Sequence, residues 1–347
     1  MIRLRPSLFG PGRGPFLLIA IFVFASAFVP VDGSAAADAP SSWKSEWPKT
    51  DFSNVRVDLS SIRSGGPPKD GIPSIDKPEF TTVGQAAMKG LAGREPVVSV
   101  VVGDDARAYP LRILMWHEIV NDTVGGMPVS VTYCPLCNSA VVFDRRLGER
   151  VLDFGTTGKL RHSDLVMYDR QTETWWQQFL GLGIVGRLAG RKLKRLPMRV
   201  ESFERFAGRY PDGKVQVPNN EGMRAYGRNP YRRYDSRSRP YFDVGSLPPG
   251  VPPLERVVVI GEQAWTFSLL REKGKVTAGA YVITWEKGQA SALDSVVIAE
   301  GRDIGNVVVQ RKGARGQWQD AVHDVSFAFA FHAFHPEGKI HSLPATK

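Results

Sequence analysis

A series of short β-branched runs, each bounded by turn residues, constrains the fold of this chain most strongly. The first runs are VVSVVV (97–102), ARAYPL (106–111), PVSVTY (128–133), AVVFD (140–144) and RVLDFG (150–155). Turn sequences such as GDD and VGG separate them, which predicts strands joined by tight turns. The chain contains 35 glycines and 25 prolines, more than is usual for a helical bundle. We therefore predict a mainly β protein, a β-rich α+β fold with a few short helices.

Two segments are predicted to form such helices. LRILMWHEIVND (111–122) carries apolar residues at helical spacing. SFERFAGRYPDG (202–213) begins with Ser202, a favourable N-cap residue, and ends in a Pro-Asp-Gly turn. The segment SFAFAF (326–331) is instead predicted as a strand, because its phenylalanines alternate and would share one face, opposite His332.

The strand pattern resumes at RVVVIG (256–261) and resembles its first occurrence. VVVGDDARAYPLRIL (100–114) is similar to VVVIGEQAWTFSLL (257–270), and VSVTYCPLCNSAVVFD (129–144) is similar to YVITWEKGQASALD (281–294). We predict a degenerate tandem repeat of one β-rich unit, with chance similarity of short strands as the alternative. Thiol chemistry would belong to the first copy alone, because Glu286 and Gln289 replace the cysteines in the second.

The N-terminus has the pattern of a secretory signal peptide. Three arginines precede the apolar run FLLIAIFVFASAFV (16–29), and the small-residue stretch GSAAAD follows it. Cleavage near Ala37 would export the protein to the periplasm or the extracellular space, and an uncleaved membrane anchor is the alternative. The predicted segments are a signal peptide (1–37), an extended lead-in (38–71), a first repeat (72–217), an Arg/Tyr/Pro-rich arm (218–253) and a second, cysteine-free repeat (254–347).

The charge of the mature chain suggests anionic partners. Loss of three arginines and Asp32 with the signal peptide lowers the formal net charge from +10 to +8. A basic exported protein is suited to an anionic membrane surface, a polysaccharide or a small acid. Nucleic acid is not expected outside the cytoplasm. The tyrosines of the arm are expected to pack across the two repeats.

Cys134 and Cys137, in the sequence YCPLCN, are the only cysteines. The strand predicted directly after them disfavours a thioredoxin-type site, in which the first thiol begins a helix. In a turn between strands, Pro135 would fix φ and Asn138 would tolerate a positive φ. Three interpretations remain open: ligands for zinc or copper, a disulfide formed in an oxidising compartment, or an active dithiol.

Additional ligands for a metal are sought among the histidines. His117 is nearest in sequence and is predicted as the third ligand; packing or hydrogen bonding is the alternative role. His332 and His335 would converge only if their predicted strand ends there.

RHSDLVMYDRQTETWWQQ (161–178) contains a polar group of residues. His162, Ser163 and Asp164 are adjacent on the chain and cannot form a catalytic relay along a strand, where consecutive side chains alternate faces. A polar site is predicted instead, and its candidate residues are Glu118, Asp164, Tyr168, Asp169, Arg170, Trp176 and Gln177. The alternative is a turn held by Asp–Arg pairing, with the tryptophans in the core.

Three segments carry a resemblance to a known family. HEIVNDTVGGMPVSVTYCPLCNSAVVFDR, FGTTGKLRHSDLVMYDRQTETWWQQ and FAFHAFHPEG resemble the exported bacterial and archaeal proteins known as domain of unknown function 3179. The resemblance spans roughly Ile72 to Pro336 and implies no activity. His162 stands where the family pattern has asparagine, so the resemblance gives it no role.

These observations support three hypotheses. The protein binds a transition metal through Cys134 and Cys137, cycles the same pair between dithiol and disulfide, or is a non-catalytic envelope binding module with a structural disulfide. The sequence contains no G-x-G-x-x-G fingerprint in strand-helix context, no P-loop, no H-E-x-x-H and no deaminase pattern. No enzymatic activity or oligomeric state is assigned.

Overall fold

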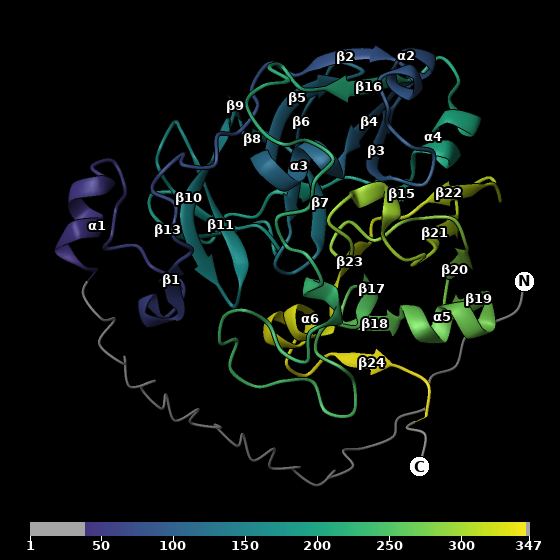
Figure 1. Ribbon diagram of the computed structural model, residues 1–347. Coiled ribbons are helices and arrows are strands. Elements are labelled where there is room, and N and C mark those ends of the chain that lie inside the picture. Colours follow the sequence, from purple (N-terminus) through teal and green to yellow (C-terminus); the bar gives the residue numbers. More distant parts are fainter. Residues whose placement is uncertain (1–38, 345–347) are drawn as a thin grey trace, which may run out of the picture. The chain divides into compact units, whose positions relative to one another are not determined.

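The computed structural model describes residues 39–344, and the predicted signal peptide at 1–37 lies outside them. Within this part of the chain, strands form several sheets and the helices are short (Figure 1). The predicted β-rich class is therefore confirmed. No helix between residues 39 and 344 has the length and apolar character needed to cross a membrane.

The helices are each six or seven residues long. They are α1 (Ser41–Glu46), α2 (Val83–Met88), α3 (Leu111–His117), α4 (Phe203–Arg209), α5 (Phe267–Lys273) and α6 (Ala328–Phe334). Ser202 is the N-cap of α4 as predicted, although its side chain makes no capping hydrogen bond. The helix predicted at 111–122 ends at His117, because Glu118 takes a positive φ of 59° and the chain continues as a strand.

The first sheet has five strands in the order β15-β3-β4-β16-β2. Their bounds are β15 (Arg199–Ser202), β3 (Pro96–Val102), β4 (Asp105–Pro110), β16 (Lys214–Val217) and β2 (Glu79–Thr82). β3 and β4 are the hairpin predicted from VVSVVV and ARAYPL. Phe203 and Phe206 of α4 and Ala86 of α2 belong to the apolar cluster that also contains Val97 and Val215 of this sheet.

The second sheet has eight strands. Seven follow the order β24-β18-β17-β23-β7-β6-β5, and β14 (Lys194–Arg195) pairs with β7. The others are β24 (Lys339–His341), β18 (Gln263–Thr266), β17 (Arg256–Ile260), β23 (Asp324–Phe327), β7 (Ser139–Asp144), β6 (Met127–Cys134) and β5 (Ile119–Val124). All six residues of β7 are buried, because this strand lies inside the sheet and is covered on both faces.

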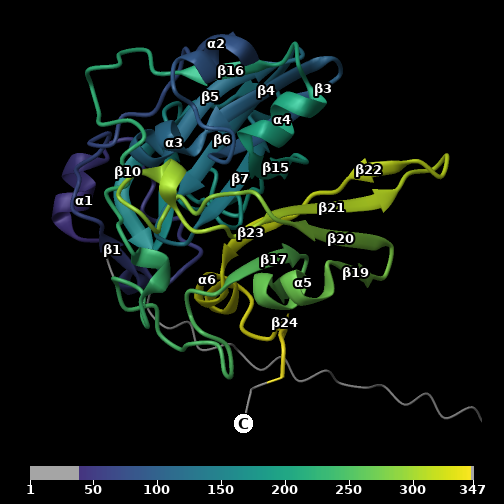
Figure 2. The same ribbon diagram turned by 45° about the vertical axis from the view of Figure 1, so that its right-hand side comes forward.

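The third sheet has the order β1-β10-β11-β12-β13. Its strands are β1 (Ile62–Ser64), β10 (Phe154–Arg161), β11 (Asp164–Asp169), β12 (Trp175–Gln177) and β13 (Leu182–Val185). A four-stranded sheet contains β19 (Lys275–Ala278), β20 (Tyr281–Glu286), β21 (Asn306–Lys312) and β22 (Trp318–Asp320), and β21 and β22 extend away from the neighbouring sheets (Figure 2). β8 (Arg146–Leu147) and β9 (Arg150–Val151) form a small hairpin.

Two groups of strands share one topology. β15-β3-β4-β16 and β23-β17-β18-β24 have the same order, with two antiparallel pairings followed by a parallel one. The hairpin of each group, β3–β4 in one and β17–β18 in the other, comes from the first pair of sequence segments that resemble each other. Ser139 begins β7, whereas Ser291 lies outside the strands, so the second resemblance does not extend to this position. The tandem repeat of whole halves stays a prediction.

The segment SFAFAF is not a strand along its whole length. β23 ends at Phe327, and α6 begins at Ala328. The alternation of phenylalanine and alanine misled the sequence interpretation, because Phe329, Ala330 and Phe331 are all buried and the helix is enclosed on several sides. His332 and His335 therefore lie at the end of a helix.

The lead-in at 38–71 is not extended throughout. It contains α1, a short 3-10 helix (Leu59–Ser61) and β1, which pairs with β10. Trp47 is 1% exposed and packs edge-on against Trp175 of the third sheet. The arm at 218–253 is mostly irregular, with a 3-10 helix at Tyr234–Ser236.

Candidate metal centre

The two cysteines lie at the turn that joins β6 to β7 in the eight-stranded sheet. Cys134 is the last residue of β6, and Cys137 precedes the start of β7 by two residues. Asn138 has a φ of 51°, as the turn sequence predicted. The Asn138 amide N–H donates to the Pro135 carbonyl over 3.2 Å, and the Tyr133 hydroxyl donates to the Asn138 side-chain oxygen over 3.2 Å. The turn is therefore a fixed element that holds both sulfur atoms.

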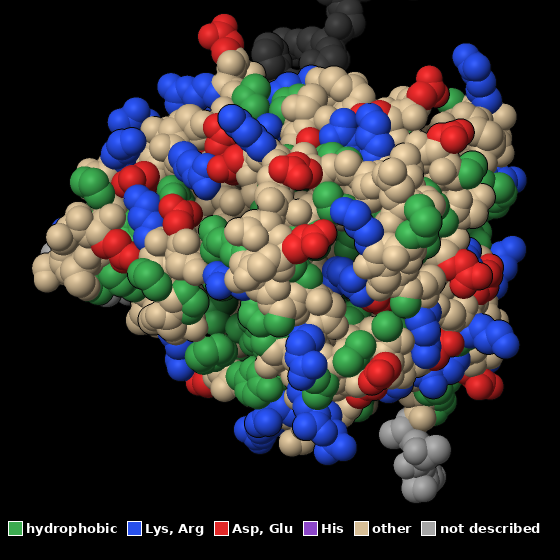
Figure 3. Space-filling model, turned by 45° about the horizontal axis from the view of Figure 1, so that its top comes forward, with side chains coloured by type: hydrophobic (Ala, Val, Ile, Leu, Met, Phe, Trp, Pro, Cys, Tyr) green, Lys and Arg blue, Asp and Glu red, His purple; other side chains and the backbone are tan. Residues whose placement is uncertain are grey.

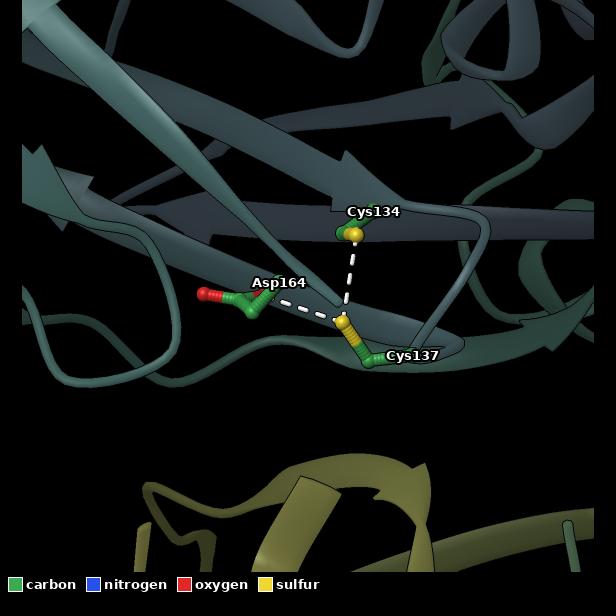
Figure 4. Close-up of side chains that lie close together, drawn as sticks. All are labelled: Cys134, Cys137 and Asp164. Carbon is green, nitrogen blue, oxygen red and sulfur yellow. Dashed lines mark hydrogen bonds between the residues drawn. The ribbon is translucent and has the colours of Figure 1, made fainter. Parts of the chain in front are cut away.

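The sulfur atoms point toward each other inside the protein. The Sγ atoms of Cys134 and Cys137 are 3.1 Å apart, and both residues are free cysteines (Figure 4). Cys134 is 1% exposed and Cys137 is fully buried. The Ser163 carbonyl oxygen lies 3.6 Å from the first sulfur and 3.4 Å from the second. A second segment of the chain therefore covers the pair.

That segment is the hairpin between β10 and β11. Arg161 pairs with Asp164, so His162 and Ser163 form a two-residue turn. Both have positive φ, 52° and 62°, as in the type I′ turns that favour Asn-Gly. Histidine is one of the few non-glycine residues enriched at positive φ, which suits position 162. The turn directs the Ser163 carbonyl and the Asp164 side chain toward the cysteines.

Asp164 begins β11 and completes the group. Its Oδ1 lies 3.1 Å from Cys137 Sγ (Figure 4). Its Oδ2 accepts hydrogen bonds from Gln177 Nε2 (2.6 Å) and from the Phe179 backbone N–H (2.8 Å). Burial raises the pKa of Asp164 to about 6, although these hydrogen bonds act in the opposite direction. The contacts from Gln177 and Phe179 fix one carboxylate oxygen and leave the other facing the thiols.

The donor set suits a transition metal. One donor atom from each of Cys134, Cys137 and Asp164 lies within 4.8 Å of the other two, and all three residues are buried. Two thiolates and a carboxylate are ligands that zinc accepts, and the sulfur pair also suits copper(I). Burial is the main cause that raises the pKa of the Cys137 thiol, followed by its hydrogen bond with Cys134 and the charge of Asp164. A bound cation would reverse this effect, because a coordinating thiol loses its proton.

His117 is not a member of this group. Its Nδ1 lies 2.7 Å from the Pro73 carbonyl oxygen, and its Nε2 lies 2.8 Å from the Tyr226 hydroxyl of the arm. Both ring nitrogens therefore have hydrogen-bond partners, and burial lowers the pKa of the ring. The third potential ligand is Asp164, which the sequence placed in a separate polar site.

Glu118 lies close to the centre at a strained backbone position. It follows α3 with positive φ, at the position where Gly274 follows α5. Burial raises the pKa of its carboxyl to about 8, and the nearby charge of Asp164 contributes. No hydrogen bond to the Glu118 carboxyl is found within residues 39–344.

The other predicted polar residues lie at the far end of β11. Asp169 accepts hydrogen bonds from Thr172 and from the Trp176 indole (2.9 Å), and this holds the turn after the strand. The Tyr168 hydroxyl donates to Asp70 over 2.5 Å, and Arg170 forms an ion pair with Asp76. These contacts are structural, but Thr172 and Trp176 hold the turn in place of the Asp–Arg pairing that the alternative supposed. Gln177 alone joins Asp164.

Both adjacent tryptophans are buried, although consecutive residues of a strand face opposite sides of the sheet. Trp175 packs against Trp43 and Trp47 of the lead-in, and Trp176 packs against Phe154. Both indoles lie in the core, as the structural alternative for this segment has them, because the lead-in covers the second face of this sheet.

The fold and the site define a β-rich protein with a buried centre of two thiols and one carboxylate. The family model described as "Protein of unknown function (DUF3179)" matches residues 69–338, and the chain belongs to this family. The match includes Cys134, Cys137 and Asp164. No curated protein and no solved structure matches the chain.

Proposed function

We propose that this is an exported protein that binds one transition metal ion, zinc or copper(I), through Cys134, Cys137 and Asp164. The observation that carries the proposal is the buried convergence of these three donors from two sheets. Ionisable groups are rarely buried together unless they are paired or coordinate a metal. Zinc(II) would offset two of the three negative charges that the deprotonated ligands bring together, and copper(I) would offset one.

The enclosure of the sulfurs favours metal binding over thiol exchange. Exchange requires a thiolate that a second thiol or disulfide can reach, and reactive cysteines are partly exposed with a lowered pKa. Here Cys137 is fully buried, its pKa is raised, and the β10–β11 turn covers both sulfurs. Metal binding does not require a second protein thiol to reach the sulfurs.

A dithiol that cycles to a disulfide is the second candidate. The 3.1 Å separation of the two Sγ atoms favours it, because bond formation would need little movement of the turn. Two electrons and two protons would leave the thiols for an external oxidant. Metal binding predicts a bound metal ion in the purified protein, whereas a redox cycle of the cysteines predicts none.

The deciding experiment measures metal content and free thiols on the same sample. The mature protein is purified from its native compartment without chelator, and metals are quantified by mass spectrometry. Metal binding predicts about one zinc or copper per chain, lost in Cys134→Ser and Cys137→Ser, with two thiols titratable after denaturation and metal removal. A metal-free sample without free thiols would contradict metal binding and leave a disulfide. A metal-free protein with two thiols that oxidise reversibly would support the redox function.

The ligand number separates the two metals. Zinc in proteins favours four ligands, whereas copper(I) is satisfied by soft ligands in smaller number. Cys134, Cys137 and Asp164 supply three, and the Ser163 carbonyl oxygen, 3.4 Å from one sulfur and 3.6 Å from the other, is a candidate for the fourth. X-ray absorption spectroscopy of the loaded protein would report the number of sulfur and oxygen neighbours. Two sulfurs with two oxygens would support zinc, and a sulfur-only shell would exclude Asp164 as a ligand.

A further inference from the structure

We propose that a second site, in a pocket between α2, β16 and the arm, binds a small organic carboxylate. The pocket has a volume of about 640 Å³, within the range of small-molecule sites. Ala86, Leu91, Ile113 and Val215 give it apolar walls. It shares no lining residue with the cysteine centre, and the proposal does not depend on metal binding.

A buried amide without partners is the first sign of a missing ligand. Gln216 of β16 lines the pocket and is 1% exposed. Neither its Oε1 nor its Nε2 has a hydrogen-bond partner among the described residues. A buried polar group left unpaired costs about 1–3 kcal/mol, so such groups are uncommon without a functional reason. Both amide atoms are covered by protein, so a ligand would reach the one acceptor and two donors of the amide only after the Gln216 side chain rotates toward the pocket.

An unpaired cation is the second sign. Arg224 of the arm also lines the pocket, and its guanidinium makes no hydrogen bond or ion pair within residues 39–344. The other cations of the pocket are engaged. Arg112 donates from Nε to Glu95 over 2.8 Å and forms an ion pair with the same carboxylate, whereas Lys89 lies 3.7 Å from Glu221 at the exposed rim. Arg224 is therefore the group that would attract an anion.

The chemistry of the pocket favours a carboxylate with an apolar body. A guanidinium binds a carboxylate through two parallel hydrogen bonds, and Arg224 supplies one such fork. A phosphate dianion would require more donors than one unpaired arginine and one amide provide. The apolar walls would cover a hydrocarbon chain, and Gln216 would bind a hydroxyl or carbonyl group on it. Lys and Arg side chains are interspersed with acidic ones over the face drawn in Figure 3, so the specificity must come from the pocket and not from a broad basic surface.

The test uses 6-hydroxyhexanoate as the probe, with saturation-transfer NMR to detect contact and titration to measure affinity. The neutral 6-hydroxyhexanamide and hexanoate, which lacks the hydroxyl, are the matched probes. The unmodified protein is expected to prefer the acid to the amide by about tenfold or more, the size of one charge-assisted hydrogen bond. Arg224→Gln is expected to abolish this preference. Arg232→Gln removes an exposed arginine of the same arm outside the pocket and should leave binding unchanged.

Gln216→Leu separates a binding role from a structural one. The variant removes the unpaired amide, so its midpoint of thermal unfolding should stay equal or rise, while its preference for 6-hydroxyhexanoate over hexanoate is lost. Equal binding of acid and amide, unchanged binding in Arg224→Gln, or no saturation transfer from any probe would overturn the proposal. Cys134→Ser should bind the probe as the unmodified protein does, so failure of the metal proposal would leave this result unaffected.

Discussion

Cys137 Sγ lies 3.1 Å from Asp164 Oδ1, although the two residues belong to turns and strands of different sheets. The cysteine turn closes β6 and β7 of the eight-stranded sheet, and Asp164 begins β11 of a five-stranded sheet. The centre thus joins two layers of the protein. A metal bound there would stabilise the folded state in proportion to its affinity, because the unfolded chain has no preformed site.

Asp164→Asn should weaken metal binding while it preserves the size of the side chain. The amide cannot supply the negative charge of the carboxylate, so we expect the affinity to fall by at least about tenfold. Competition with a chromophoric chelator measures the change. Asp153→Asn provides the control, because it removes one negative charge at a side chain that is 45% exposed. Equal affinities of the two variants would exclude Asp164 from the ligand set.

Tyr234→Phe should destabilise the cysteine turn. The Tyr234 hydroxyl donates to the Leu136 carbonyl over 2.8 Å within the C-P-L-C sequence, and the tyrosine ring is fully buried. Loss of the donor leaves a buried carbonyl unpaired, which costs about 1.5 kcal/mol of unfolding free energy. Denaturant unfolding measures this cost. Tyr241→Phe, at the exposed ring that stacks on Tyr234, should change stability by much less.

Glu118→Gly should be more stable than Glu118→Ala. Both variants remove the buried carboxyl, so the difference between their unfolding free energies reports the cost of the backbone conformation at φ 59°. A side chain with a Cβ is disfavoured there by about 1–2 kcal/mol, partly offset by the larger unfolded-state entropy of glycine. We expect the unfolding free energy of Glu118→Gly to exceed that of Glu118→Ala by about 1 kcal/mol, as measured by denaturant unfolding. An alanine variant of equal stability would show that the position is not strained.

His323 should make stability fall at acidic pH. Its ring is buried, Nδ1 bonds to the Ala321 carbonyl over 2.9 Å, and Nε2 has no partner among the described residues. Burial lowers its pKa below the usual 6.5, so the unfolded state binds the proton more strongly. The stability that the neutral His323 ring contributes to the folded state is fully present above pH 6.5. It is lost as the pH falls below that value, at up to about 1.4 kcal/mol per pH unit.

The comparison for this prediction is His323→Asn, which keeps a donor near Ala321 but does not titrate. Unfolding free energies of both proteins are measured between pH 8 and pH 5. Asp324 and Arg195 form a neighbouring ion pair that both proteins keep, and the charge of Asp324, which favours protonation of the ring, is part of the measured difference. A constant difference across this range would contradict the assignment.

Local sequence patterns were sufficient for features that depend on near neighbours. VVSVVV, ARAYPL, PVSVTY and AVVFD form strands β3, β4, β6 and β7, because alternation and turn residues act within one hairpin. The positive φ of Asn138 follows from the turn chemistry of C-P-L-C-N. The same reasoning failed at SFAFAF, where burial on several sides of a helix produced an alternating pattern that resembles a strand.

Local sequence patterns could not identify the side chain that joins the two cysteines in the metal centre. His117 was the nearest histidine in sequence, but its ring is held by Pro73 and by Tyr226 of the arm. Asp164 is recognisable only when the β10–β11 hairpin is placed against the cysteine turn, since 27 residues separate it from Cys137. The sequence identified Asp164 only as a member of a separate polar site.

The sequence by itself determined strands such as β3, β4, β6 and β7, the turn that brings two thiols together, and membership in the family. These properties depend on propensity, turn geometry and motif, which act over a few residues. Only the tertiary structure decided which third side chain faces the thiols, how deeply they are buried, and which turn covers them. Such properties arise from the packing of two sheets, and packing is fixed by contacts between residues far apart in the chain.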